Sequence, residues 1–455
     1  MQIKKFLVLM FVFILFSTVA ANETESISEQ AAVYQYTDMT SSAGFLAGSL
    51  STAPLLSLTR DRKDILYLPS IISVLGKGEV YLDNQSFNNA WPDNVGTIIP
   101  TAGRKLFFNL YLFRHNNVFN DPQNLISELD PAEFPGISDS TSDNFIAPLI
   151  LFGGGGFAYN FGGFHLGMGM KYYSNAFKNK TTNETAGTKV DTGSDHLSQK
   201  LEFTPSVTIL REKLSMDFGF NFAYQWINNT IHTENRGFRY DYTGNPEFSL
   251  YGRGDYQITD WSAFTASFAL GYIPFDSGVI DVSNNEKIGK REYDDILFDL
   301  RLGVRITPIE DLVSTTGIAY LMKHSKRFAK DVVADDLYSS EENIENFHTF
   351  YITQMIEYQM TDWFSMKAGV GKTFRISKYE DTEKVDQSQS RTDKSVSQSL
   401  DTVDGFGKYL GLGFHYRNFR LDTVVNLGLI TKGPYMITGN NMNDMAYIAN
   451  LSYDW

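Results

Sequence analysis

The sequence predicts an all-β protein whose fold is a transmembrane antiparallel β-barrel of about 14 strands with an N-terminal plug segment. Three observations lead to this fold class. From about Arg104 onward, apolar and polar residues alternate with a period of two. The connections between these segments are alternately short and long. The chain ends on an aromatic residue, Trp455, that closes a final alternating segment.

The clearest alternating segment is Leu214–Trp226. Its even positions are all apolar or aromatic, whereas its odd positions are small or polar. Successive side chains of a strand point to opposite faces of the sheet, so one face of this strand is wholly apolar. Similar segments predict the strands Arg104–Phe113, Phe145–Asn160, Phe164–Tyr173, Gln199–Leu210, Leu214–Trp226, Phe248–Ile258, Ser262–Ile273, Asp295–Thr307, Leu312–His324, Phe347–Met360, Phe364–Arg375, Gly405–Tyr416, Phe419–Thr431 and Met445–Trp455.

The connections predict which end of the barrel faces which compartment. Short turns such as Arg211–Lys213 and Thr361–Trp363 alternate with long polar segments, as in outer-membrane barrels with short periplasmic turns and long outer loops. The segments expected to be long loops are Ser174–Ser198, Asn228–Pro246, Phe275–Glu292, Ser325–Asn346, Ser377–Thr402 and Lys432–Asn443.

Aromatic residues mark the predicted strand ends. The last strand resembles the terminal signal that the barrel-assembly machinery recognises, and the residues that share its apolar face are Tyr447, Leu451, Tyr453 and Trp455. Three further tryptophans lie at the ends of predicted strands and predict a belt at the membrane–water interface: Trp226, Trp261 and Trp363.

The N-terminus predicts export. Residues 1–21 have the order of a secretory signal peptide, with Lys4 and Lys5, the apolar run Phe6–Phe16 and the small residues Val19–Ala21. We expect cleavage and location in the outer membrane of a Gram-negative-type bacterium, in contact with outer-membrane lipids and lipopolysaccharide.

Composition excludes several classes of function. The formal net charge of −14 argues against nucleic-acid binding, which needs clustered Lys and Arg. The absence of cysteine excludes disulfides, zinc–thiolate sites and a catalytic thiol. The seven histidines have no metal-ligand spacing, and Gly153–Gly156 lacks the Lys-Ser/Thr of a phosphate loop. We therefore expect no enzyme activity, no metal and no cofactor.

Residues 22–103 do not follow the hairpin rhythm of the predicted barrel domain, residues 104–455. Ser41–Leu58 and Ile65–Leu82 are apolar and must be buried. One interpretation is a periplasmic or lumenal plug. The other is one or two further strands, Ile65–Pro69 and Glu79–Leu82, extending the barrel to 16 strands.

The inward faces of the predicted strands carry charges of both signs. They could form a selectivity ladder along the lumen, or they could only compensate one another in a solvated interior. The candidates for lumen-facing positions are Asp217, Arg253, Asp255, Asp295, Asp299, Arg301, Arg305, Lys367, Arg375, Arg420 and Asp422.

A signal peptide, a plug and about 14 strands in a chain of this length resemble the FadL-type outer-membrane transporters. Gly78–Asn84, followed by Ala90-Trp91-Pro92, is similar to the segment that precedes the first strand in that family. The family's Asn-Pro-Ala motif is missing, because Trp91 precedes Pro92 and Asp93 follows it. The resemblance implies passive uptake of small hydrophobic or amphipathic molecules through a plugged barrel.

Two other functions remain open. An open diffusion porin would fold a charged loop inward, and Asn116–Asn144 is the candidate. A structural or adhesion barrel would act through its outer loops, of which Glu380–Thr402 is rich in Ser, Thr and acidic residues.

Overall fold

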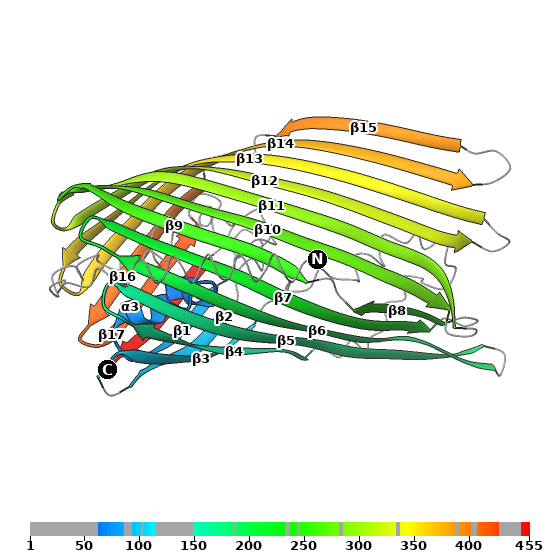
Figure 1. The fold of residues 1–455 in the computed structure, drawn as a ribbon, viewed down its shortest axis with the longest axis horizontal. Helices are drawn as coiled ribbons and strands as arrows, with labels where there is room; N and C mark the ends of the chain where they lie inside the picture. The colour runs from blue at the N-terminus through cyan, green and yellow to red at the C-terminus, as the bar shows by residue number, and fades with distance from the viewer. Residues whose placement is uncertain are drawn as a thin grey trace, which may run out of the picture.

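The computed structural model describes residues 62–85, 93–101, 103–114, 149–185, 188–232, 237–243, 246–281, 285–333, 337–386, 391–401, 407–426 and 447–455. These residues form one closed antiparallel sheet around a short inner segment, residues 62–78 (Figure 1). The inner segment contains the 3-10 helix η2 (Arg62–Leu66) and the helix α3 (Ile71–Leu75). No helix in the described part of the chain is long and apolar enough to cross a membrane.

Within the described residues, the sheet contains 18 strands. In chain order they are β1 (Glu79–Gln85), β2 (Asp93–Pro100), β3 (Leu106–Arg114), β4 (Leu149–Asn160), β5 (Phe164–Thr185), β6 (Thr188–Leu210), β7 (Leu214–His232), β8 (Gly237–Thr243), β9 (Glu247–Thr259), β10 (Ser262–Asp281), β11 (Glu286–Ile309), β12 (Leu312–Val333), β13 (Leu337–Thr361), β14 (Phe364–Asp386), β15 (Arg391–Asp401), β16 (Gly407–Tyr416), β17 (Phe419–Asn426) and β18 (Tyr447–Asp454).

Two positions in the ring are each filled by two strands. β8 and β9 both pair with β7 and with β10, while β15 and β16 both pair with β14. The 18 strands therefore fill 16 positions around the barrel. The predicted all-β antiparallel barrel is confirmed, but the prediction of about 14 strands was too low because β1 and β2 belong to the ring.

The ring closes where β1 pairs with β18. Seven pairs of Cα partners join these strands, from Glu79 opposite Asp454 to Gln85 opposite Ile448. The backbone N–H of Trp455 donates to the carbonyl oxygen of Gly78 at 3.0 Å. Closure leaves neither β1 nor β18 as a free edge, which a sheet surrounded by lipid requires.

The final strand turns its predicted apolar face outward. Leu451, Tyr453 and Trp455 are 43%, 40% and 50% exposed on the outer surface, and Tyr447 begins the same strand. Asn450 and Ser452, which alternate with them, are buried inside the ring. The alternation that predicted the C-terminal strand is therefore confirmed.

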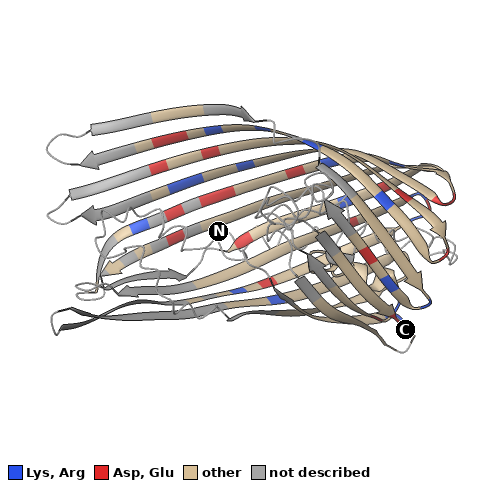
Figure 2. Ribbon diagram, turned by 180° about the vertical axis from the view of Figure 1, so that it is seen from behind, with Lys and Arg blue, Asp and Glu red and all other residues tan. Residues whose placement is uncertain are grey.

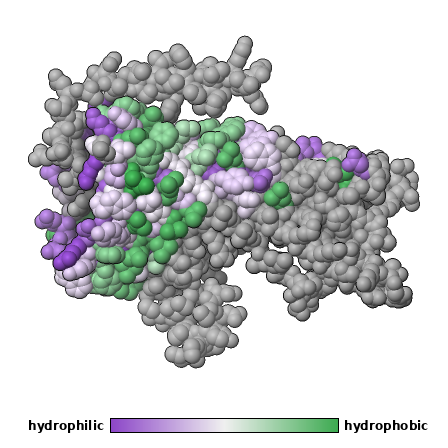
Figure 3. All heavy atoms as spheres, turned by 90° about the horizontal axis from the view of Figure 1, so that it is seen from below, coloured by the Kyte–Doolittle hydropathy of each residue, from purple (hydrophilic) through white to green (hydrophobic). Residues whose placement is uncertain are grey.

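Burial is inverted relative to a water-soluble protein. On β5 the apolar residues Leu166, Met168 and Met170 are exposed, while His165 and Lys171 are buried. The same alternation holds along β7, where the predicted polar face points inward. Apolar residues gather across the outer wall, next to hydrophilic residues at the end that carries the short turns (Figure 3). This surface is suited to contact with lipid.

The segments predicted as long loops are mostly strand. β11 and β13 have 24 and 25 residues, whereas about 9–11 tilted residues cross a bilayer. Ser174–Ser198, for example, lies in the paired strands β5 and β6. Five of the six predicted loops were therefore wrong, and Lys432–Asn443 lies outside the described residues. The reason is that these extensions project beyond the apolar belt, so neither face needs apolar residues and the alternation disappears.

Trp261 and Trp363 lie at short turns, as expected, and each is 55% exposed. Trp226 is also exposed, but β7 continues beyond it to His232, so Trp226 does not end its strand. The signal peptide 1–21 and the candidate porin loop Asn116–Asn144 lie outside the described residues.

The outward orientation of β12 gives a test of the apolar belt. Ile318 is 55% exposed on the outer face. Replacing it with Arg would place a charge in the lipid, and we expect a loss of about 2–4 kcal/mol in the free energy of unfolding. The measurement is urea unfolding in phospholipid vesicles, with Ile318→Val as the matched control. Equal stability of the two variants would contradict this orientation.

Candidate functional site: the inner segment and the charged inner wall

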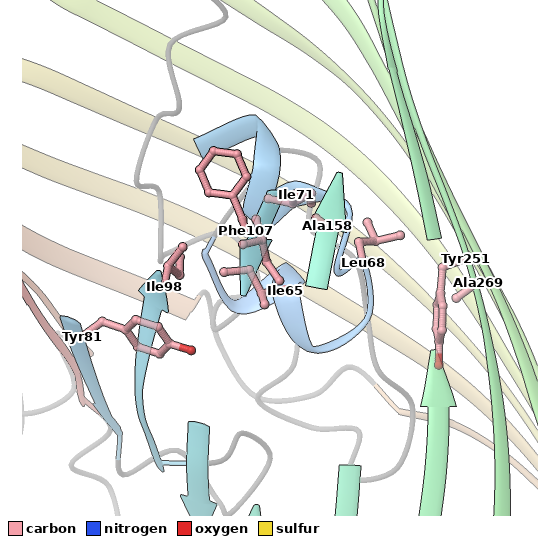
Figure 4. Packing of buried hydrophobic residues seen from close by; sticks show 10 residues of the cluster. Ile65, Leu68, Ile71, Tyr81, Ile98, Phe107, Ala158, Tyr251 and Ala269 are labelled. Carbon is pink, nitrogen blue, oxygen red and sulfur yellow. The ribbon is translucent and has the colours of Figure 1, made fainter. Parts of the chain in front are cut away.

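The inner segment is apolar and is enclosed by the barrel wall. Leu68, Ile71 and Ile72 are fully buried. They form one cluster with residues that β1, β2, β3, β4, β9 and β10 turn inward (Figure 4). These wall residues are Tyr81, Ile98, Phe107, Ala158, Tyr251 and Ala269. Burial of this apolar surface provides the main favourable free energy for seating the segment.

Serine hydroxyls join the segment to the wall. The backbone N–H of Ser70 donates to Oγ of Ser206 at 2.8 Å, and the Ser70 hydroxyl lies 2.9 Å from that of Thr208. One turn later, Oγ of Ser73 lies 2.8 Å from Nδ1 of His165. All these groups are buried, so each hydrogen bond satisfies atoms that have lost contact with water. The bonds fix the position of the segment against β5 and β6.

A buried arginine holds the segment by charge. Nη1 of Arg253 lies 2.6 Å from Oδ2 of Asp64, and its Nε donates to Oδ2 of Asp217 at 2.9 Å. The Arg253 side chain is 0% exposed. A buried charge is costly unless it is paired and hydrogen-bonded, so the two carboxylates stabilise Arg253 in place. Asp64 belongs to η2, and Arg253 therefore links the inner segment to β9 and β7.

Glycines in the wall make room for the segment. A Cβ at Gly167 would lie 2.1 Å from the backbone nitrogen of Ser70. A Cβ at Gly219 would lie 2.7 Å from the carbonyl oxygen of Tyr67. Real Cβ atoms do not approach backbone this closely, so β5 and β7 need glycine at these two positions for the segment to fit.

Tyr67 connects the segment to a row of charges. The ammonium of Lys171 lies 4.9 Å from the centre of its ring. Burial raises the pKa of Tyr67 well above its ordinary value, and the carboxylates of Glu202 and Asp64 raise it further, so the phenol stays neutral. The charges continue across the wall through Lys171–Glu202 at 2.5 Å and Lys200–Glu247 at 2.5 Å.

The structure places all the predicted lumen-facing residues on inward faces, but it divides them between two parts of the wall. Asp217, Arg253 and Asp255 lie beside the inner segment on β7 and β9. The others lie on β11, β14 and β17: Asp295, Asp299, Arg301, Arg305, Lys367, Arg375, Arg420 and Asp422.

Several residues of this second group form ion pairs within the wall. Arg301 pairs with Asp299 at 2.8 Å, and Lys367 pairs with Asp422 at 2.7 Å. Asp295 pairs with Lys323 at 3.1 Å. Residues of both charge signs are interspersed over the strands of the wall (Figure 2). Compensation within the wall therefore applies to these pairs, while a role in permeation remains a proposal.

Sequence reasoning missed part of the site. Lys171, Lys200, Glu202 and Glu247 also face inward, and the period-two alternation of their strands could have identified them. No pattern in the sequence indicates that the hydroxyls of Ser206 and Thr208 bind the inner segment. The run Gly153–Gly156, whose composition suggested close packing against a plug or a bend, lies in β4. A Cβ at Gly154 would instead lie 2.7 Å from the Tyr111 ring of β3, and the glycines that contact the inner segment lie on β5 and β7.

The charged anchor gives a graded prediction. Asp64→Asn leaves Arg253 paired with Asp217, so we expect a loss of about 1.5–3 kcal/mol in the free energy of unfolding. Arg253→Met removes the guanidinium from both Asp64 and Asp217, so we expect a larger loss of about 3–5 kcal/mol in the free energy of unfolding. Guanidinium unfolding followed by tryptophan fluorescence measures both values. A cost for Arg253→Met no larger than that for Asp64→Asn would contradict the anchor.

No family model and no curated protein matches the sequence. Among solved structures, the toluene transporter TodX of Pseudomonas putida matches with a TM-score of 0.39 and 8% identity, over 90% of this chain and 96% of that one. The toluene transporter TbuX of Ralstonia pickettii has a TM-score of 0.36 and 11% identity, over 86% and 92%. The alcaligin outer-membrane receptor FauA of Bordetella pertussis has a TM-score of 0.35 and 7% identity, over 83% and 75%.

At these TM-scores the likenesses carry no argument about this chain. Its assignment to the closed antiparallel β-barrels follows from its own strand pairing.

Proposed function

We propose that this chain is an outer-membrane channel for the passive uptake of small hydrophobic or amphipathic molecules, and that the inner segment closes its lumen. The observation that carries this proposal is the seating of residues 62–78 inside the ring by apolar packing, serine hydrogen bonds and Arg253. A segment bound this specifically is more than a connection between an N-terminus and the first strand. The domain division that we propose changes accordingly: the barrel begins at Glu79, and the proposed plug includes the inner segment, residues 62–78.

The chemistry of the inner wall favours amphipathic solutes within this class. Apolar wall residues such as Phe107 and Tyr251 are already covered by the inner segment. Away from it, the described inner faces of β11, β14 and β17 carry ion pairs such as Arg301–Asp299 and Lys367–Asp422. A purely apolar solute would gain little from these surfaces, whereas a solute with a polar group could hydrogen-bond to them.

The second candidate is an open diffusion porin. Its supporting observation is the same charged wall, since porin lumens are polar and filled with water. The two candidates differ in one property: a porin conducts steadily in its resting state, and a plugged channel does not.

Cysteine chemistry can separate the two candidates. The chain contains no cysteine, so Ser70→Cys with Ser206→Cys introduces the only two thiols, at positions whose hydroxyls lie 3.0 Å apart. We expect the oxidised protein to show a low conductance in planar bilayers that rises on reduction, because the disulfide fixes the segment to β6. The single variant Ser70→Cys is the control and should not respond to the redox state. A large, steady conductance in both states of the double variant would favour the porin.

A further inference from the structure

A second set of polar groups lies on the inner faces of β10, β11 and β12, outside the inner segment's contacts. Its centre is Gly303 on β11, which faces Thr265 of β10 on one side and Gly317 of β12 on the other. Arg301 and Arg305 flank Gly303 along the same inward face of β11. Neither glycine has a side chain, so no wall side chain at these two positions separates the two arginines.

Within the described part of the chain, three side chains around Gly303 have polar atoms without a hydrogen-bond partner. These are Oγ1 of Thr265, Oγ1 of Thr315 and Nη1 of Arg301. Their residues are 0%, 6% and 2% exposed. Leaving such a group unsatisfied destabilises the folded protein, so three together on adjacent strands need an explanation.

The arginines give this part of the wall a positive charge. Asp299 accepts hydrogen bonds from Nε and Nη2 of Arg301, at 3.0 and 2.8 Å. The planar guanidinium then keeps Nη1 on the edge turned away from that carboxylate. Arg305 has no ion pair with any residue in the described part of the chain. One carboxylate thus balances two guanidinium groups.

The sheet geometry brings these groups within reach of one ligand. Successive inward residues of a strand are about 6.6 Å apart, and neighbouring strands are about 4.8 Å apart. A group above Gly303 would therefore lie one step from Arg301, Arg305 and Thr265, and a diagonal step from Thr315, which is opposite Arg305. The next acidic residue in this row, Asp255, is opposite Thr265 on β9 and hence one strand farther from Gly303.

We propose that the inner wall around Gly303 binds an oxyanion, meaning a phosphate, sulfate or carboxylate group. The groups that face it are hydrogen-bond donors, and guanidinium is the side chain best matched to the planar or tetrahedral oxygens of such anions. The site would bind the anionic group of the amphipathic solute. Its role in uptake therefore rests on the proposed function. Its chemistry does not depend on whether the inner segment moves.

Calorimetric titration of the full-length protein in detergent tests the site with inorganic phosphate, sulfate and acetate as separate probes. We expect at least one anion to bind, and Arg305→Gln to weaken it by about tenfold or more through loss of a charged hydrogen-bond donor. Arg420→Gln removes an inward arginine of β17 and is the matched control. The preferred anion distinguishes a phosphate or sulfate ligand from a carboxylate.

Thr265→Val gives a readout that a merely structural role would not produce. It should weaken anion binding, yet leave the anion-free protein equally or more resistant to urea, because it removes a buried hydroxyl that has no partner. Absence of binding for all three anions, or unchanged binding in both Arg305→Gln and Thr265→Val, would overturn the site. Neither result depends on conductance, so failure of the site is distinguishable from failure of the channel.

Discussion

Lipid cannot hydrogen-bond to a protein backbone, and this constraint determines the architecture of the chain. Each N–H and C=O group in the apolar belt must pair within the sheet, so the first and last strands must meet. β1 and β18 do so over seven residue pairs, and the closure continues to the chain end through the Trp455–Gly78 hydrogen bond. The outward aromatic and aliphatic residues and the inward polar residues follow from placing that closed sheet between lipid and a polar interior.

The interior then has to satisfy its own polar groups, and the protein does so in two ways. Between β1 and β10 the wall receives the inner segment, which brings apolar side chains, two serines and Asp64 to meet apolar residues, hydroxyls and Arg253. From β11 to β17 many of the charges pair within the wall, as in Arg301–Asp299 and Lys367–Asp422. Neither arrangement satisfies Nη1 of Arg301 or the hydroxyls of Thr265 and Thr315, and a solute anion would complete their hydrogen bonding.

The alternation in the sequence predicted strands only where one face meets lipid and the other meets a polar lumen. β7 meets this condition along Leu214–Trp226, and the prediction there was correct. β1 and β2 do not, because Tyr81 and Ile98 face inward against the apolar inner segment and so both faces carry apolar residues. For this reason the family resemblance placed Gly78–Asn84 before the first strand. In the structure, Glu79–Gln85 is itself the first strand. Ile65–Pro69, the other proposed strand, lies in η2 and the turn before α3.

The lumen-facing charges were predictable, since register alone sets the direction of a side chain, but their partners were not. The pairing of Arg253 with Asp64 joins residues 189 positions apart, and no local pattern indicates it.

The central claim is that the inner segment is seated as firmly as the wall. Hydrogen exchange of the purified barrel in detergent tests this claim most directly. The backbone N–H groups of Leu68, Ser70 and Ile71 are hydrogen-bonded at 2.6, 2.8 and 3.0 Å. We expect them to exchange as slowly as the strand amides of β6. Exchange at the rate of an unstructured peptide, while β6 remains protected, would contradict it.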